Sequence, residues 1–408
     1  MFKNESYKWF VLIVMSISEL MVMSLWFSAS AIAPELAPIW GVSGAGTLLI
    51  TMMVQFGFVF GALISATIGL ADKIEPRLLF TISGIFSATL NIFFVFLYHY
   101  FIIEMVLMLL IGVSMAGIYP VAVLIVSNWF PERRGLALGI VIAGLTLGSS
   151  LPHLILNLPF IRYWQALLGF SSLLAFTGAL AVFFGINNKN KKIKANRLKW
   201  NTIGKILKNK SLMLANLGYF GHQWELYAMW TWIPVFIFSS FSFYYKGIHL
   251  LFMAGIVSFL IIGLSGVIGS IMGGIVSDRI GRTLSTSIYL LISGACAIII
   301  GLTYGGTPII TIVIGVIWGI FVIADSAQFS TAVTELSDIT IRGSALTFQM
   351  AIGFLITVGS IYMIDILRTT IGWHWAFAAL SIGPVIGIAA MINLRYRKDA
   401  YTMCNGRR

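Results

Sequence analysis

Residues 187–210 read NNKNKKIKANRLKWNTIGKILKNK, and they form the one long polar stretch in a chain of 408 residues. Nine of these residues are Lys or Arg. Over the whole chain, 59% of residues are hydrophobic and 10% are charged, whereas soluble globular domains carry about 25% charged residues. Too little polar surface remains to cover a water-soluble protein of this length. The polar stretch therefore divides a chain whose solvent is lipid.

Twelve apolar runs flank this stretch, six on each side. A helix needs about 20 apolar residues, at 1.5 Å per residue, to cross roughly 30 Å of hydrocarbon. Helix is the only suitable form, because unpaired backbone groups in lipid cost several kcal/mol each and the runs are too long and uniform for barrel strands. The predicted spans are residues 9–32, 47–70, 78–97, 102–126, 136–158, 165–186, 211–238, 249–275, 283–303, 308–331, 344–366 and 375–394.

These runs predict an all-α membrane protein with twelve transmembrane helices in two six-helix bundles. The first bundle covers residues 1–186, and a basic linker covers residues 187–210. The second bundle, with a short tail, covers residues 211–408. Two cysteines, Cys296 and Cys404, are too few for a disulfide framework or a cysteine-rich metal site.

The positions of Lys and Arg predict the orientation of the chain. The net charge of +12 by itself could indicate binding to nucleic acid. However, 23 of the 26 basic residues fall on the side of the two termini and the linker, and Arg162, Lys246 and Arg368 fall on the other side. The positive-inside rule then predicts a cell (inner) membrane protein with both termini in the cytoplasm, and no nucleic-acid partner. The basic linker serves as a topology anchor or, alternatively, binds a regulator or anionic lipid.

The two halves repeat short motifs at an offset of a little over 200 residues. GLADKI at 69–74, after the second run, corresponds to VSDRI at 276–280, after the eighth run. RGLAL at 134–138 likewise corresponds to RGSAL at 342–346. Each half is therefore interpreted as a copy of one six-helix unit.

The stretch GIVSDRIGR at 274–282 contains a Gly, a short spacer, an Asp, a basic residue, and then Gly and Arg. In this order it resembles the loop signature of the major facilitator superfamily. The first-half copy keeps Asp72, Lys73 and Arg77. It has Ile68 and Glu75-Pro76 where the glycines of the signature would be. The resemblance covers essentially the whole chain. It implies two pseudo-symmetric six-helix bundles that move a small solute by alternating access, with the monomer as the functional unit.

Carboxylates of this loop provide candidate gating residues. A carboxylate at the start of a helix is favoured by the helix dipole and can pair with an arginine from a neighbouring loop. The resemblance implies that Asp72 with Arg134, and Asp278 with Arg342, latch the cytoplasmic side. Plain helix capping is the alternative. The full set of gating candidates is Asp72, Arg134, Asp278, Arg279, Arg282, Glu335 and Arg342.

Ionisable side chains at membrane depth are the main candidates for function, because a charge at the bilayer centre costs about 2.5–3.5 kcal/mol or more. These residues are Glu19, His153, His222, Glu225 and Asp325, and no Lys or Arg lies at comparable depth. Glu225 is predicted to be the principal coupling or solute-binding acid, with Glu19 facing it and Asp325 as a further coupling candidate. The resemblance places Glu19 and Glu225 at a central cavity.

Other polar and aromatic residues are predicted to line that cavity. His222 and Glu225 are three residues apart and share a helix face. A planar or cationic solute could stack on the aromatic residues of the same helix. Structural roles are the alternative, since buried acids and histidines are often satisfied packing groups. The cavity candidates are His222, Gln223, Trp224, Tyr227, Gln55 and His153.

Absent motifs narrow the class of protein. The sequence has no phosphate-binding glycine loop followed by Lys-Ser/Thr, no His-Glu-x-x-His and no Gly-x-Ser-x-Gly. We therefore expect neither an ATP-driven pump nor an enzyme, and we expect no cofactor. Proton-coupled secondary transport, as symport or antiport, is the leading hypothesis. A membrane sensor or receptor that binds its ligand without moving it is the alternative.

The same residues bear on the class of solute. The chain also resembles the nitrate/nitrite branch of the superfamily, which binds its anion with an arginine in the second helix and another in the eighth. Neither predicted helix has an arginine at depth here. A cationic, metal-bearing or neutral small molecule is therefore favoured over a small inorganic anion.

Overall fold

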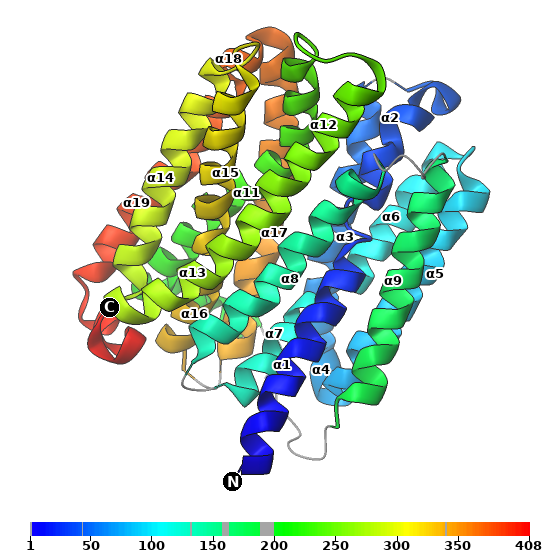
Figure 1. Cartoon of the computed structure of the whole chain (residues 1–408). Helices are drawn as coiled ribbons and strands as arrows, with labels where there is room; N and C mark the ends of the chain where they lie inside the picture. The colour runs from blue at the N-terminus through cyan, green and yellow to red at the C-terminus, as the bar shows by residue number, and fades with distance from the viewer. Residues whose placement is uncertain (1, 43, 131–132, 157–162, 188–199, 339–340) are drawn as a thin grey trace. The chain divides into compact units, whose positions relative to one another are not determined.

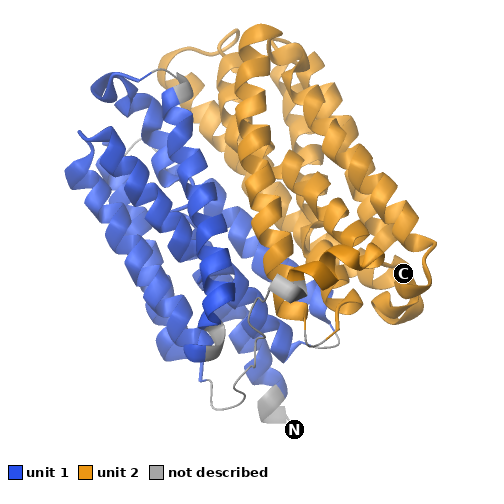
Figure 2. Ribbon diagram, turned by 180° about the vertical axis from the view of Figure 1, so that it is seen from behind, with its two compact units in different colours: residues 1–197 blue, residues 198–408 orange. Residues whose placement is uncertain are grey.

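The computed structural model describes residues 2–42, 44–130, 133–156, 163–187, 200–338 and 341–408. Its regular structure is helical, and no β-strand occurs in these ranges. Contacts divide the chain into two compact units, unit 1 (Met1–Arg197) and unit 2 (Leu198–Arg408), which Figure 2 shows in different colours. Most of the predicted linker, residues 188–199, lies outside the described residues.

Unit 1 contains nine helices within its described residues (Figure 1). They are α1 (Phe2–Met23), α2 (Ser28–Trp40), α3 (Gly44–Ile68), α4 (Leu70–Lys73), α5 (Pro76–Leu97), α6 (Phe101–Met115), α7 (Tyr119–Trp129), α8 (Arg134–Ile155) and α9 (Trp164–Gly185).

Two of the predicted spans in unit 1 are interrupted. The first breaks between α1 and α2, where the N–H groups of Leu25 and Trp26 bond to carbonyls three residues earlier. Ser28 then begins α2 and donates to the buried Asn91 Oδ1 at 3.1 Å. The fourth span breaks between α6 and α7, which starts with a proline in its first turn. Proline has no N–H to donate, so it suits the start of a helix.

Unit 2 contains ten α-helices and three shorter segments in the part that the structure describes. They are α10 (Trp200–Lys208), α11 (Lys210–Phe241), α12 (Gly247–Phe259), the π-helical turn η1 (Leu260–Leu264), α13 (Ser265–Ile280), α14 (Arg282–Leu302), α15 (Pro308–Ala324), α16 (Ser326–Leu336), α17 (Arg342–Thr370), α18 (Trp373–Ala376), the 3₁₀ turn η2 (Phe377–Ser381), α19 (Ile382–Arg395) and the tail segment η3 (Lys398–Gly406).

Eleven stretches of the described chain are helical, long and apolar enough to cross a membrane. They coincide with eleven of the twelve predicted spans. The other predicted span, 211–238, falls on α11, which has 32 residues and is about 48 Å long. Its length suffices, but polar side chains such as His222, Gln223 and Glu225 interrupt its apolar sequence.

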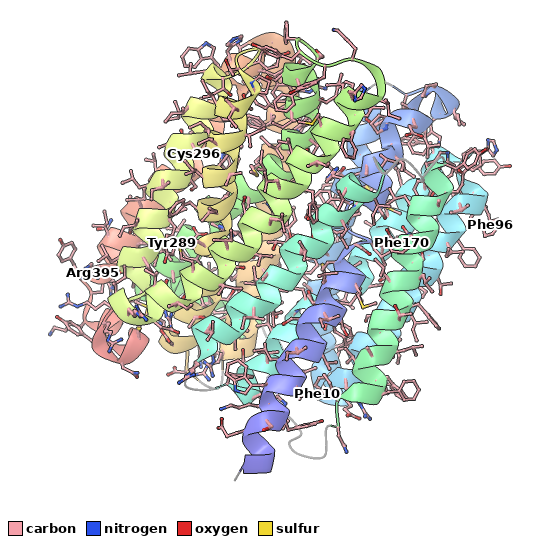
Figure 3. The ribbon with its side chains drawn as sticks, viewed as in Figure 1. Phe10, Phe96, Phe170, Tyr289, Cys296 and Arg395 are labelled. Atoms are coloured by element: carbon pink, nitrogen blue, oxygen red, sulfur yellow. The ribbon has the colours of Figure 1, made fainter. Side chains whose placement is uncertain are left out.

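The outer faces of both units are apolar. In unit 1, Phe10, Phe96 and Phe170, labelled in Figure 3, are 46%, 71% and 46% exposed. In unit 2, Leu291 and Ile309 are 62% and 60% exposed. Burying such side chains away from water is favourable by about 25 cal/mol per Å² of apolar surface. Large aromatic side chains that point outward along several helices are consistent with a lipid surround.

Glycines bring helix backbones into direct contact within each unit. In unit 1, a Cβ on Gly57 would lie 2.0 Å from the carbonyl oxygen of Leu109, so α3 and α6 touch through their backbones. In unit 2, a Cβ on Gly269 would lie 2.0 Å from the carbonyl oxygen of Ile320. Such contacts are typical of membrane helices, where small residues allow close approach.

Candidate functional site

Glu225 lies on α11 and faces α14 and α15 inside unit 2. Its side chain is buried, and both carboxylate oxygens accept hydrogen bonds. Trp318 Nε1 on α15 donates to Oε1 at 2.7 Å, and Ser293 Oγ on α14 donates to Oε2 at 2.9 Å. The Trp318 ring makes an edge contact with Phe377, at 5.3 Å between centroids. Three helices therefore fix the position of this carboxylate.

His222 lies three residues before Glu225 on α11 and contacts a second buried acid. Its Nδ1 is 2.8 Å from Oδ1 of Asp325, and each side chain is 1% exposed. The other ring nitrogen, Nε2, has no hydrogen-bond partner among the described residues. The ring packs beside those of Tyr219 and Phe329, with centroids 5.9 Å and 5.8 Å away. A buried imidazole and carboxylate thus pair next to Glu225.

Asp325 stands at the break between α15 and α16. Its backbone carbonyl accepts from the N–H of Gln328 at 2.9 Å, which starts the second helix. On α13, a Cβ on Gly273 would lie 2.0 Å from the carbonyl oxygen of Ala324, the residue before Asp325. The backbone at the break is therefore held against a glycine that has no side chain to separate the two helices.

The remaining polar residues of α11 mainly serve packing inside unit 2. Gln223 Nε2 donates to the hydroxyl of Tyr219 at 2.5 Å. Trp224 Nε1 donates to the carbonyl oxygen of Ala379 at 3.3 Å. Tyr227 packs on Trp230 and Phe354, with ring centroids 5.4 Å and 5.0 Å away. Of the predicted cavity residues on this helix, Trp224 and Tyr227 thus have clear structural partners.

Unit 1 contains buried polar side chains that, unlike Glu225, have no hydrogen-bond partner among the described residues. Glu19 on α1 and Gln55 on α3 are both fully buried. None of their four side-chain oxygen and nitrogen atoms has a hydrogen-bond partner within the described chain. Tyr119, at the start of α7, is buried as well. His153, near the end of α8, lies 6.2 Å from the Phe27 ring.

The loop with the predicted signature is organised around Arg282. Gly281 has φ +94°, a conformation that favours glycine, and it turns the chain from α13 into α14. Arg282 then folds back, so that its Nη1 lies 2.7 Å from Asp278 Oδ1 and donates to Gln328 Oε1 at 2.7 Å. Its Nη2 lies 3.3 Å from Glu335 Oε1. One guanidinium therefore joins α13, α14 and α16.

This pairing differs from the one predicted for the loop. Asp278 pairs with Arg282 rather than with the predicted Arg342, because the turn at Gly281 brings position 282 back onto the preceding helix. No salt bridge of the described residues includes Arg342 or the exposed Arg279. The side chain of Asp72 lies outside the described residues, so its pairing with Arg134 stays a prediction.

The chain's last residues fold over the same loop. Cys404 N–H donates to Glu335 Oε2 at 3.1 Å, and Arg407 Nη1 donates to the carbonyl oxygen of Asp278 at 2.7 Å. The N–H of Thr283 donates to the carbonyl oxygen of Arg408 at 3.2 Å. Burial raises the pKa of the Cys404 thiol, so the thiol stays protonated at neutral pH. The tail thus completes one end of unit 2.

Comparison with known protein families decides the class of this chain. A model of the Major Facilitator Superfamily matches residues 15–356. The chain belongs to the Major Facilitator Superfamily. The resemblance seen in the loop signature at 274–282 is thereby confirmed.

Two relatives of this major facilitator chain are themselves transporters by name. It is 26% identical over 247 residues to the MFS-type transporter pytF of Aspergillus terreus, covering 59% of this chain and 77% of that protein. It is 23% identical over 316 residues to the hexuronate transporter of Escherichia coli K12, covering 71% of this chain and 72% of that protein. Members of the superfamily are multi-pass membrane transporters rather than enzymes, and their partner is a small-molecule solute.

In this major facilitator chain, the structure groups some of the predicted site residues and separates others. It brings His222 and Asp325 together, and it places Glu225 on the same helix within one turn. Glu19, Gln55 and His153 belong to unit 1, so a cavity shared with Glu225 stays a prediction. Within the residues that the structure describes, no group of three or more His, Cys, Asp or Glu could hold a metal ion.

Two residues next to Glu225 were not among the predicted site residues. Trp318 lies in the middle of the apolar run 308–331, where a tryptophan looks like one more apolar side chain. Its indole N–H needs a partner when buried, and this requirement is the signal that could have identified it. Ser293 carries no such signal, because serines in membrane helices commonly bond to their own backbone.

Proposed function

We propose that this major facilitator chain is a secondary active transporter that moves a small solute by alternating access, coupled to protons through Glu225. The observation that carries the proposal is a glutamate with two hydrogen-bond donors, buried on α11 beside the His222–Asp325 pair. An acid at this depth is costly to retain unless it is used. In this proposal α11 is the seventh of twelve spans, the two units are pseudo-symmetric six-helix bundles, and both termini are cytoplasmic.

One coupled carboxylate is sufficient for substantial accumulation. A proton that moves down about 120 mV supplies about 2.8 kcal/mol. At 1.4 kcal/mol per factor of ten, this corresponds to roughly 100-fold accumulation of the solute. Glu19 is the second candidate for coupling, since a buried acid with no partner in its own unit requires a proton, water or the solute to satisfy it.

The buried charges favour a cationic, metal-bearing or neutral solute. Among the described residues, Arg282 is the one buried Lys or Arg, and it lies at a helix start where its partners are already protein groups. The hexuronate transporter is named for an organic anion, and recognition of a carboxylate usually uses arginine. We therefore expect an amine, a metal complex or a neutral metabolite in place of a sugar acid.

The test begins with the identity of the solute. Purified protein is screened by thermal shift against amines, metals, metabolites and siderophores, and each hit is tested for flux into liposomes. With a transported hit, Glu225→Gln should abolish accumulation driven by a pH gradient while exchange persists, because the amide keeps the shape but cannot titrate. Glu35→Gln, which changes an exposed glutamate on α2, should accumulate the solute normally.

Two outcomes would contradict the proposal. Normal pH-dependent accumulation by Glu225→Gln would exclude Glu225 as the coupling acid and make Asp325 the next candidate. A hit that binds tightly but shows no flux in the wild-type protein would favour the alternative function of a membrane sensor.

A further inference from the structure

The hydroxyl of Ser293 has two possible acceptors, and it can serve only one at a time. Its Oγ lies 2.9 Å from Glu225 Oε2 and 3.2 Å from the backbone carbonyl oxygen of Leu290, one turn earlier in α14. A serine hydroxyl has one hydrogen to donate and two lone pairs that accept. When its hydrogen points to Leu290, Oγ is therefore free to accept a hydrogen bond from Oε2.

Trp318 imposes the opposite restriction on the other oxygen of Glu225. An indole N–H can donate but cannot accept. At 2.7 Å from Trp318 Nε1, Oε1 must remain an acceptor whether or not Glu225 carries a proton. The geometry of the two partners thus makes the two carboxylate oxygens inequivalent.

We infer that Ser293 and Trp318 are positioning residues that direct the coupling proton to Oε2 of Glu225 and satisfy the carboxyl group in both of its charge states. This inference rests on the proposed role of Glu225 in coupling. In the ionised state, Ser293 donates to Oε2 and Trp318 donates to Oε1. When one proton arrives, a single O–H bond forms at Oε2, and this group donates to Ser293 Oγ. The hydroxyl of Ser293 rotates to Leu290, and no other bond changes.

Other titratable groups surround this arrangement. Asp325, at the break between α15 and α16, is buried and paired with His222 of α11. Cys296 lies on α14 three residues after Ser293 and is buried; Figure 3 labels its position. The buried His222–Asp325 pair and Glu225 thus share α11 within one helical turn. Glu19 in unit 1 has no comparable donors among the described residues.

Infrared difference spectroscopy tests this assignment without knowledge of the solute, because the probe is the proton. Full-length protein in lipid is titrated with acid and base, and the carbonyl stretch of protonated carboxyl groups is recorded. Glu225→Gln should remove one band. Trp318→Phe should shift that band to higher frequency, since the carbonyl at Oε1 loses its N–H donor. Ser293→Ala should also shift it, and Ser293→Thr, which retains a hydroxyl, should return it to the wild-type position.

The outcomes separate this inference from the proposed function. If Glu225→Gln removes a band that stays unshifted in both Trp318→Phe and Ser293→Ala, Glu225 titrates but the positioning role is wrong. If Glu225→Gln removes no band at any pH at which the protein remains folded, Glu225 does not take up a proton and the proposed coupling fails as well. Size-exclusion profiles confirm folding of each variant, and Ser293→Ala decides alone if Trp318→Phe does not fold.

Discussion

Nδ1 of His222 lies 2.8 Å from Oδ1 of Asp325, and both side chains are 1% exposed. Asp325 reaches this position because the tenth predicted span is broken at that residue. The pair thus links α11 to the junction of α15 and α16. A buried ion pair of this kind adds little to the net free energy of unfolding. Removing one partner nevertheless destabilises the protein, because the other partner is left buried and unpaired.

Disruption of this pair should therefore be non-additive. Asp325→Ala and His222→Ala should each lower the free energy of unfolding by about 1–3 kcal/mol, since the remaining buried polar group loses its partner. The double variant should cost less than the sum of the two by about 0.5–3 kcal/mol. Denaturant unfolding in detergent measures the free energy of unfolding of the wild type, the two single variants and the double variant. Simple additivity would show that the two side chains do not interact.

The glycine contact at the break gives a second prediction. Gly273→Ala should destabilise the protein by about 1–3 kcal/mol or more, because its Cβ would lie 2.0 Å from the carbonyl oxygen of Ala324. The matched control is Gly359→Ala on α17, where a Cβ has no atom within 4 Å. There the change should be neutral or stabilising by up to about 1 kcal/mol. Equal effects of the two substitutions in thermal unfolding would contradict this account of the break.

The signature loop gives a third prediction. Asp278→Asn removes the charge that pairs with Arg282, while Gln328 and Glu335 still hold the guanidinium. We expect solute flux to slow several-fold while the amount of protein in the membrane stays normal. Asp338→Asn, an exposed aspartate after α16, is the control and should leave the flux unchanged. Unchanged flux in Asp278→Asn would limit this aspartate to a structural ion pair with Arg282.

The orientation of the chain gives a fourth prediction. Reporter fusions at Lys199, in the basic linker, and at Lys246, between the predicted seventh and eighth spans, should report opposite sides of the membrane. Lys199 should be cytoplasmic. A result with both reporters on one side would mean that α11 does not cross the membrane, and the predicted count of twelve helices would be wrong.

Much of the helical pattern could be predicted from run lengths alone, because lipid requires long apolar helices. The breaks between α1 and α2 and between α15 and α16 could not, since the residues at them do not end the apolar runs. Asp325 interrupts the tenth run by one residue, and the chain from Ser24 to Phe27 contains no proline or glycine to indicate a turn. Such breaks depend on tertiary contacts, such as that of Gly273 with the backbone of Ala324.

The candidate site was predicted in part. The cost of burying charge identified Glu225, His222 and Asp325 without any structural knowledge. The cost of burying charge cannot identify Trp318 and Ser293, because these uncharged side chains cost little free energy to place in lipid. Their role becomes visible only in the structure, where both donate to the carboxylate of Glu225. The pairing of the signature aspartate was predicted wrongly because the left-handed turn at Gly281, which brings Arg282 back, cannot be inferred from the motif.

The contact between the tail and the signature loop also bears on how the protein is made. Thr283 and Arg408, which bond to each other, are 125 residues apart in the chain. At a synthesis rate of about 5–20 residues per second, the ribosome needs about 6–25 s to produce the second partner after the first. During that interval Gly281 and the end of α13 lack the cover that the tail provides. This end of unit 2 can therefore be completed only after residues 404–408 have been synthesised.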